Sequence, residues 1–350
     1  MRPIKIVLVA LVALVATDPS ARAQGNLPVS LFERYLEALR QQSGIPGMSV
    51  AIVQNGRVVW DAGLGYRDVE ALVRPTPDTP YPVFGLTQAL SSTVVLQQCL
   101  EQGYLKLTDR VQKWNPQFPE TNTTIAQLLA HVTPAGTFKY DLERFSALTE
   151  VANQCSNSRY VRLLTEEIFN RLGMMNSMPG ADVLDPSSPH RRWINASTLD
   201  NYAALYREQA APYKVDSRGR PTRSTVPAAA LSAATGVITT VRDLARFDTA
   251  LDDDGVLLEA STRSRAWESM GSAPVGLGWF VSRYNGEQVV WHFGLARDAY
   301  SSLMVKVPSR NLTLILLANS DGLAGPSYNL ADGNISSNLF ASLFLKLFVG

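Results

Sequence analysis

The chain has 350 residues, of which 32 are Lys or Arg and 31 are Asp or Glu, so its formal net charge is +1. Because the charges nearly cancel, the composition argues against nucleic acid or an anionic membrane as the main partner. Hydrophobic residues make up 46% of the chain, with no low-complexity tract or obvious repeat, which is typical of a globular protein.

The N-terminal residues have the pattern of an export signal. Arg2 and Lys5 supply a short positive region, Ile6–Ala16 is an almost unbroken apolar run, and Ala21-Arg22-Ala23 is the small-x-small pattern that signal peptidase cleaves. The apolar run is too short for a membrane-spanning helix. We therefore expect residues 1–23 to be a cleaved signal peptide, and the mature protein to be periplasmic or secreted without a transmembrane segment.

The strands predicted in the mature chain, residues 24–350, lie near its two ends. Asn55-Gly56 and Asn285-Gly286 each separate two β-type runs, which is a strong hairpin signal. The short connections predict one antiparallel sheet of about five strands, built from residues 45–65 and 277–319. The runs with strand character are Met48–Val53, Arg57–Asp61, Gly278–Ser282, Gln288–His292, Tyr300–Val307 and Leu312–Ala318.

Helical periodicity flanks these strands and fills the interval between them. Leu31–Gln41 and Asn334–Phe348 carry apolar residues at helical spacing and should lie side by side on one face of the sheet. The insert, about residues 85–255, is mainly helical, so the fold class is α+β and a ligand cleft is expected between sheet and insert. Its predicted helices are Thr87–Gln102, Ile125–Ala130, Ala147–Cys155, Tyr160–Leu172 and Thr240–Leu251.

The cysteines and histidines carry limited information. Export would bring Cys99 and Cys155 into an oxidising compartment, which allows a disulfide between them. Both lie on helix-like segments, so two separate buried thiols are the alternative. His131, His190 and His292 are far apart in the sequence and have no ligand-type partner at short spacing, so neither a metal site nor a cofactor is expected.

Six segments of the chain occur in the order known from one enzyme family. They are Pro46-Gly-Met-Ser-Val-Ala-Ile-Val53, Thr79-Pro-Tyr81, Ile125-Ala-Gln-Leu-Leu-Ala-His131, Ile168-Phe-Asn-Arg-Leu-Gly-Met174, Thr240-Val-Arg-Asp-Leu-Ala-Arg-Phe247 and Trp291-His-Phe-Gly294. In these segments, and over nearly all of the mature chain, the sequence resembles the serine β-lactamase and penicillin-binding (DD-peptidase) family. The resemblance is greatest to the class C and esterase-like branch, and it implies the β-lactamase/transpeptidase-like fold.

The resemblance implies three catalytic motifs. Family members open a central helix with S-x-x-K, where the lysine lies one turn from the serine hydroxyl, on the same face, and helps to activate it. The N-terminus of that helix favours the developing oxyanion. A Tyr-x-Asn loop supplies a second proton-transfer group, and a Lys/His-x-Gly strand binds substrate beside the oxyanion hole.

The first motif has lost both of its reactive side chains. Alignment of Thr79–Gln88 places Gly85 at the serine position and Gln88 at the lysine position. Glycine carries no nucleophile, and a glutamine amide is neither a base nor a cation. No serine in the chain is followed by lysine three residues on. Thr87, the nearest hydroxyl, should face away from the cleft, because it lies about 200° around the helix from Gly85.

The other two motifs are kept in part. Tyr140 matches the family tyrosine, whereas Leu142 replaces the asparagine, and His292-Phe-Gly294 fits the His-x-Gly variant. A packed aromatic residue and a structural histidine are the alternatives for Tyr140 and His292. The resemblance therefore predicts Tyr140 and His292 as catalytic remnants and, as substrate-contacting positions, Gly85, Gln88, Leu142, Gly294 and Ser301.

Two functions are consistent with this pattern. Loss of the nucleophile costs a serine hydrolase on the order of 10⁶ in turnover, and loss of its partners adds little. The first hypothesis is a catalytically inactive family member that binds a small molecule, a peptidoglycan-like peptide or a protein partner in the cell envelope. The alternative is an active hydrolase of esters, amides or β-lactams, in which Tyr140 and His292 polarise a water molecule.

Overall fold

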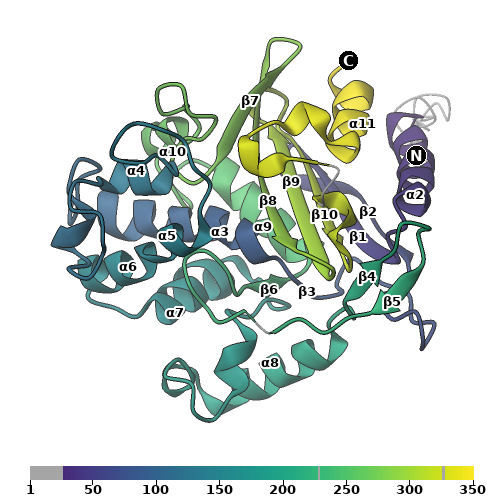
Figure 1. Cartoon of the computed structure of the whole chain (residues 1–350), viewed down its shortest axis with the longest axis horizontal. Coiled ribbons are helices and arrows are strands. Elements are labelled where there is room, and N and C mark those ends of the chain that lie inside the picture. Colours follow the sequence, from purple (N-terminus) through teal and green to yellow (C-terminus); the bar gives the residue numbers. More distant parts are fainter. Residues whose placement is uncertain (1–26, 228, 325–327) are drawn as a thin grey trace, which may run out of the picture.

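The computed structural model describes residues 27–227, 229–324 and 328–350, so the predicted signal peptide lies outside the described residues. Its main sheet is antiparallel and has six strands in the order β2-β1-β10-β9-β8-β7, one more than the sequence predicts (Figure 1). The strands are β1 (Gly47–Gln54), β2 (Arg57–Gly65), β7 (Phe280–Tyr284), β8 (Glu287–Ala296), β9 (Tyr300–Val307) and β10 (Leu312–Ala318).

The two ends of the chain meet in the middle of this sheet. β1 pairs with β10 so that Met48 lies opposite Ala318 and Gln54 lies opposite Leu312. Both strands are apolar almost throughout because helices cover both faces of the sheet. Two further ladders are too short for sequence periodicity to predict. They are β3 (Tyr81–Pro82) with β6 (Ile238–Thr239), and β4 (Tyr213–Val215) with β5 (Pro221–Arg223).

One face of the sheet is covered by helices from the two ends of the chain. α2 (Leu27–Gln42) and α11 (Leu339–Phe348) lie side by side there, as predicted, and Phe32 contacts Phe344 edge-to-face at 6.1 Å between ring centroids. The helix predicted from Asn334 begins later, because the Asn338 side chain caps α11 by accepting from the backbone N–H of Ala341.

The opposite face packs against the insert. α3 (Thr87–Val95) is entirely buried and runs through the insert, and α9 (Val241–Asp252) lies on β1 and β10. Cys99, just after α3, forms a disulfide with Cys155 of α6, with 5.7 Å between their Cα atoms. The other helices are α4 (Ile125–Leu129), α5 (Leu142–Ser146), α6 (Leu148–Ser156), α7 (Tyr160–Arg162, continued to Asn170), α8 (Ala196–Glu208) and α10 (Ala260–Ala266).

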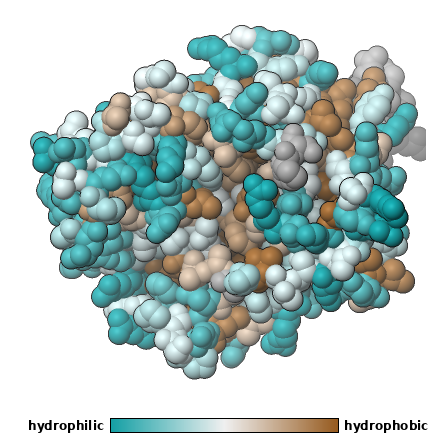
Figure 2. All heavy atoms as spheres, viewed as in Figure 1, coloured by the Kyte–Doolittle hydropathy of each residue, from teal (hydrophilic) through white to brown (hydrophobic). Residues whose placement is uncertain are grey.

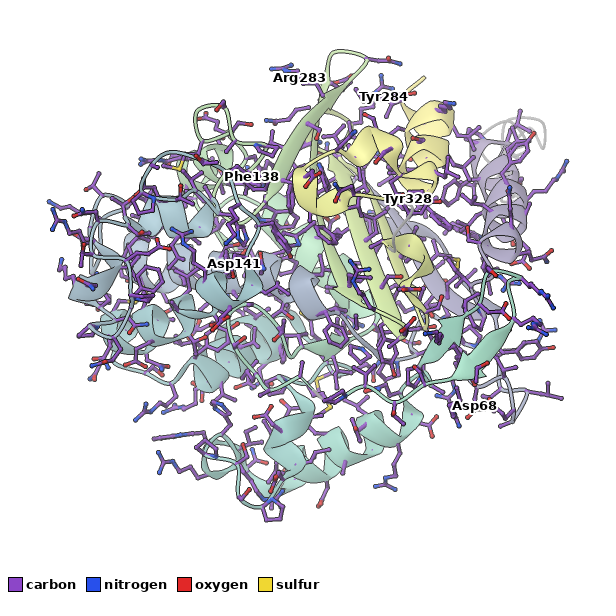
Figure 3. The ribbon with its side chains drawn as sticks, in the orientation of Figure 1. Asp68, Phe138, Asp141, Arg283, Tyr284 and Tyr328 are labelled. Carbon is purple, nitrogen blue, oxygen red and sulfur yellow. A yellow bond between two sulfur atoms is a disulfide. The ribbon has the colours of Figure 1, made fainter. Side chains whose placement is uncertain are left out.

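Apolar atoms reach the surface along the line where the insert meets the sheet, within a mainly polar exterior (Figure 2). Phe138 and Asp141 lie on the loop between α4 and α5, close to this boundary (Figure 3). Within the described ranges, no helix has the length and apolarity needed to cross a membrane.

Candidate active site of the family

The three motif segments meet at the free edge of β8. β7 pairs only with Glu287–Trp291, so the rest of β8 continues past it and lies against the 3-10 turn Phe84–Leu86 that precedes α3. A Cβ atom at Gly294 would lie 1.9 Å from the carbonyl oxygen of Val83. Glycine is therefore required for this approach, and the Ser302 hydroxyl reinforces it by donating to the same oxygen at 2.9 Å.

Gly85 has no open space beside it for a nucleophilic side chain. A Cβ atom there would lie 2.6 Å from Tyr140 Oη, 3.0 Å from the carbonyl oxygen of Phe293 and 3.6 Å from Leu142 Cδ2. The first distance is shorter than atoms tolerate, so any residue larger than glycine requires Tyr140 to move. Three positions predicted from the resemblance therefore contact one another here, and Tyr140 occupies the space into which a serine would project.

Phe84, the residue before Gly85, has a strained backbone that the sequence analysis missed. Its φ angle is +44°, a region in which a bulky L-residue is an outlier. Such a conformation costs on the order of 1–3 kcal/mol and persists only where the surroundings enforce it. The Phe84 ring stacks on Tyr300, with 6.2 Å between centroids and 28° between ring planes.

Gln88 lies in the first turn of α3, where its side-chain oxygen receives two histidine hydrogen bonds. Gln88 Oε1 lies 2.8 Å from His131 Nε2 and 3.2 Å from His292 Nε2. The backbone N–H of Asp141 donates to His131 Nδ1 at 3.1 Å, whereas His292 Nδ1 lies 2.9 Å from the backbone nitrogen and 3.0 Å from the backbone oxygen of Phe293. Because both Nε2 atoms face the amide oxygen, which only accepts, each Nε2 carries the proton and each ring is a neutral donor to that oxygen.

Burial keeps both histidines neutral. It lowers the pKa of His292 to about 4. It also lowers the pKa of His131 well below its usual value, with smaller contributions from His292 and Arg144. A lysine in place of Gln88 would direct its ammonium at two N–H donors, which is unfavourable in a buried site. The glutamine is thus matched to its surroundings in hydrogen bonding.

Tyr140 is packed by its ring and neutral at its hydroxyl. The ring lies 5.2 Å from Phe293 and 5.7 Å from Phe280, between centroids. Burial raises the pKa of the Tyr140 hydroxyl, and its contact with Gln88 Nε2, at 3.4 Å, offsets this only in part. The phenol therefore stays protonated at neutral pH.

Leu142 and Ser301, the remaining predicted positions, differ in location. Leu142 begins α5, and its side chain reaches Gly85. The N-cap of this helix is Asp141, whose side chain accepts from the backbone N–H of Arg144. Ser301 lies apart from the cluster: its hydroxyl donates to Ser320 O at 2.6 Å and accepts from Leu323 N. The next residue on β9, Ser302, lies opposite Gly294, and the Ser302 hydroxyl faces the motif segments.

The Thr and Ser hydroxyls that follow Gly85 on α3 are engaged elsewhere. Thr87 Oγ1 accepts from the backbone N–H of Val237 at 3.3 Å, in agreement with the prediction that it faces away from the cleft. Ser91 donates to Thr87 O and contacts the Tyr160 hydroxyl, while Ser92 donates to Ala89 O. No group of three or more His, Cys, Asp or Glu side chains suited to a metal ion occurs within the described part of the chain.

A family profile described as Beta-lactamase matches residues 32–333. The chain belongs to the beta-lactamase family. It is 23% identical over 325 residues to Protein flp of Staphylococcus aureus (strain MW2), covering 80% of this chain and 60% of that protein, so it spans less than two thirds of this relative.

Solved structures of the family share the fold. A D-alanine carboxypeptidase AmpC from Burkholderia cenocepacia superposes with a TM-score of 0.69 at 20% identity, covering 92% of this chain and 99% of that one. A D-amino acid amidase from Ochrobactrum anthropi SV3, complexed with L-phenylalanine amide, superposes with a TM-score of 0.70 at 17% identity, covering 91% of this chain and 99% of that one. The β-lactamase/transpeptidase-like α+β fold predicted from the sequence is confirmed.

The buried histidine pair should make this family member sensitive to acid. His292 titrates near 6.5 when unfolded and near 4 when folded, so the unfolded chain binds more protons between those values. The stability that depends on neutral His292 is fully present above pH 6.5 and is lost as the pH falls toward 4. From pH 7 to pH 5 we expect the free energy of unfolding to fall by about 2 kcal/mol through His292 alone. Urea unfolding should show a shallower pH dependence in His292→Gln; equal slopes would contradict the assignment.

The contact between Gly85 and Tyr140 can be measured by a double-mutant cycle. Gly85→Ala places its Cβ against Tyr140 Oη and should lower the free energy of unfolding by about 1–3 kcal/mol. Tyr140→Phe removes that oxygen, so the same substitution should cost at least about 1 kcal/mol less in the Phe background. Chemical denaturation of the four proteins gives the coupling. Strict additivity would show that Tyr140 does not fill the space beside Gly85.

Proposed function

We propose that this chain is a non-acylating member of the β-lactamase family that acts as a binding module of the cell envelope. The observation that supports this proposal most directly is made at Gly85, which aligns with the family serine. A Cβ atom at Gly85 would lie 2.6 Å from the Tyr140 hydroxyl. A covalent acyl intermediate needs a nucleophile at that position and room for the attacked carbonyl. Neither is available beside Gly85.

The surroundings of the lysine position support the same proposal. Gln88 receives hydrogen bonds from His131 and His292 and is held by three parts of the fold: α3, the loop before α5, and β8. Such a fully hydrogen-bonded buried network is specific to one arrangement of donors and acceptors. The site has therefore been rebuilt around a neutral amide, a change that goes further than the loss of one catalytic group.

The alternative of a hydrolase that uses Tyr140 and His292 finds no support in the geometry. Both nitrogens of His292 are hydrogen-bonded to protein groups, and its low pKa keeps it neutral. Tyr140 has a raised pKa, so it holds its proton at neutral pH. Neither residue is placed to take a proton from a water molecule.

We expect the purified protein to give no turnover of a chromogenic ester or of a chromogenic cephalosporin above the background of its Tyr140→Phe variant. Steady-state absorbance assays at pH 7, run beside an active class C enzyme, measure this. Turnover by the wild type that disappears in Tyr140→Phe would favour the hydrolase.

Export of the mature chain is part of the proposal and is tested by fractionation of cells that express the full sequence.

Covalent probes test the proposed function directly. A fluorescent penicillin and a fluorophosphonate should leave the wild type unlabelled, whereas an active family member in the same gel is labelled. We expect Gly85→Ser with Gln88→Lys to stay unlabelled as well, because the Tyr140 hydroxyl and the two histidine donors oppose the restored side chains.

Labelling of a wild-type serine in the cleft, located by peptide mass spectrometry, would overturn the proposal. Labelling of the double variant alone would show that the cleft tolerates the family residues and that only the chemistry was lost. Thermal denaturation of both proteins confirms that the comparison is between folded chains. Pull-down from envelope extracts, compared with thermal shifts by small ligands, separates a protein partner from a small molecule or a peptidoglycan-like peptide.

A further inference from the structure

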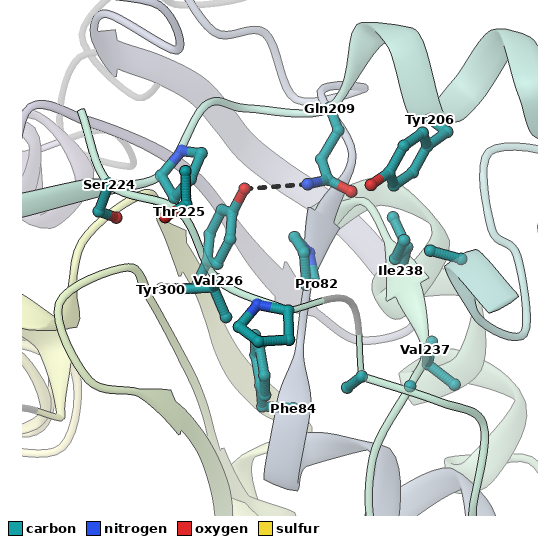
Figure 4. A pocket seen from close by; sticks show the side chains of 15 residues that line it. Pro82, Phe84, Tyr206, Gln209, Ser224, Thr225, Val226, Val237, Ile238 and Tyr300 are labelled. Carbon is teal, nitrogen blue, oxygen red and sulfur yellow. Dashed lines mark hydrogen bonds between the residues drawn. The ribbon is translucent and has the colours of Figure 1, made fainter.

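A cavity of about 250 Å³ has Phe84 in its wall (Figure 4). Phe84 and Tyr300 form part of its wall, and Gly85, Tyr140 and His292 do not line it. The lining residues come from six parts of the chain between Pro82 and Tyr300, and they include Tyr206, Gln209 and Val226.

The lining of the cavity selects against charge. None of these residues is Asp, Glu, Lys, Arg or His, so an ionic ligand would lose its hydration without gaining a partner. The stacked rings of Phe84 and Tyr300, together with nearby proline side chains, offer flat apolar walls. The volume is below the range of about 300–1,000 Å³ typical of sites for drug-sized ligands. The cavity therefore suits a small, uncharged and flat apolar molecule.

One polar atom in the wall lacks a partner. Tyr300 Oη donates to Ala210 O at 2.7 Å, so it accepts from Gln209 Nε2 at 2.9 Å, which fixes the orientation of the Gln209 amide. Its other atom, Gln209 Oε1, is buried and makes no hydrogen bond within the described residues. A buried acceptor without a donor is unfavourable, and a ligand N–H would satisfy it.

We propose that this cavity binds a neutral aryl amide, whose ring packs on Phe84 and Tyr300 and whose N–H donates to Gln209 Oε1. This deepens the proposed function, on which it rests for the absence of covalent chemistry. The ligand is held by apolar burial and one hydrogen bond, separate from the positions of the family's catalytic motifs.

Isothermal titration of the full chain with matched ligands tests this site. The probes are benzamide, cinnamamide and indole-3-carboxamide, each with its N,N-dimethyl amide and its carboxylate. We expect at least one primary amide to bind about tenfold more tightly than its N,N-dimethyl form, since one hydrogen bond distinguishes them. The carboxylates should show no measurable binding, because the wall offers them no cation.

Variants assign the effect to Gln209. Gln209→Met removes the acceptor at similar size and should abolish the preference for the primary amide, while Tyr206→Phe, which removes another hydroxyl from the wall, should leave it intact. Val226→Phe, which fills the cavity, should weaken every amide at least tenfold. Circular dichroism and melting curves show whether each variant is folded; if Gln209→Met fails to fold, Val226→Phe and the carboxylate comparison still test the site.

Failure of all three primary amides to bind would overturn the proposal. So would a preference that persists in Gln209→Met, or binding that Val226→Phe leaves unchanged. These results are independent of the acylation probes: a labelled serine in the family site would refute the proposed function without affecting the ligand preference. Conversely, an unlabelled chain that binds no amide would refute the cavity assignment alone.

Discussion

The amide oxygen of Gln88 is the point at which three parts of the fold are joined. It accepts one hydrogen bond from His131, in the loop that follows α4, and one from His292, in β8, while Gln88 itself belongs to α3. Two buried donors share one acceptor that has two lone pairs, so the cluster is satisfied without any charge. Because the backbone N–H of Asp141 fixes the tautomer of His131, the residue at position 88 must accept and cannot only donate. The packing of the motif segments is therefore matched to a neutral acceptor at position 88.

The family fold is intact around the motif segments. Gly294 still lets β8 approach Val83, and the Tyr140 loop is still held by the Asp141 cap and by His131. What has changed is local: the Tyr140 hydroxyl fills the space beside Gly85, and Leu142 adds an apolar contact. The same scaffold can therefore carry different functions, because activity depends on a few side chains placed on it.

The sequence predicted the elements with strong local signals and the positions that the family motifs align. The Asn-Gly turns and the apolar runs identified the six strands of the main sheet, although the predicted sheet was expected to have about five strands. Ser301 was expected at the site, whereas it is Ser302 that faces the motif segments; alternate residues of a strand face opposite sides, so a one-residue shift changes the face. The cavity could not be predicted, since its wall combines residues from Pro82 to Tyr300 and the Gln209 amide is oriented by a tertiary contact.

Phe84 belongs both to the motif segments and to the cavity, since its backbone leads directly into Gly85 and its side chain lines the cavity. A strained residue is retained only where its surroundings hold it. On the Gly85 side there is no side chain and no nucleophile for the strain to position. On the cavity side, the ring gains its stacking on Tyr300, whose hydroxyl in turn orients Gln209. Gly294 of β8 and the Ser302 hydroxyl also hold Val83, the residue before Phe84, so the Phe84 conformation is supported both by the motif segments and by the wall of the cavity.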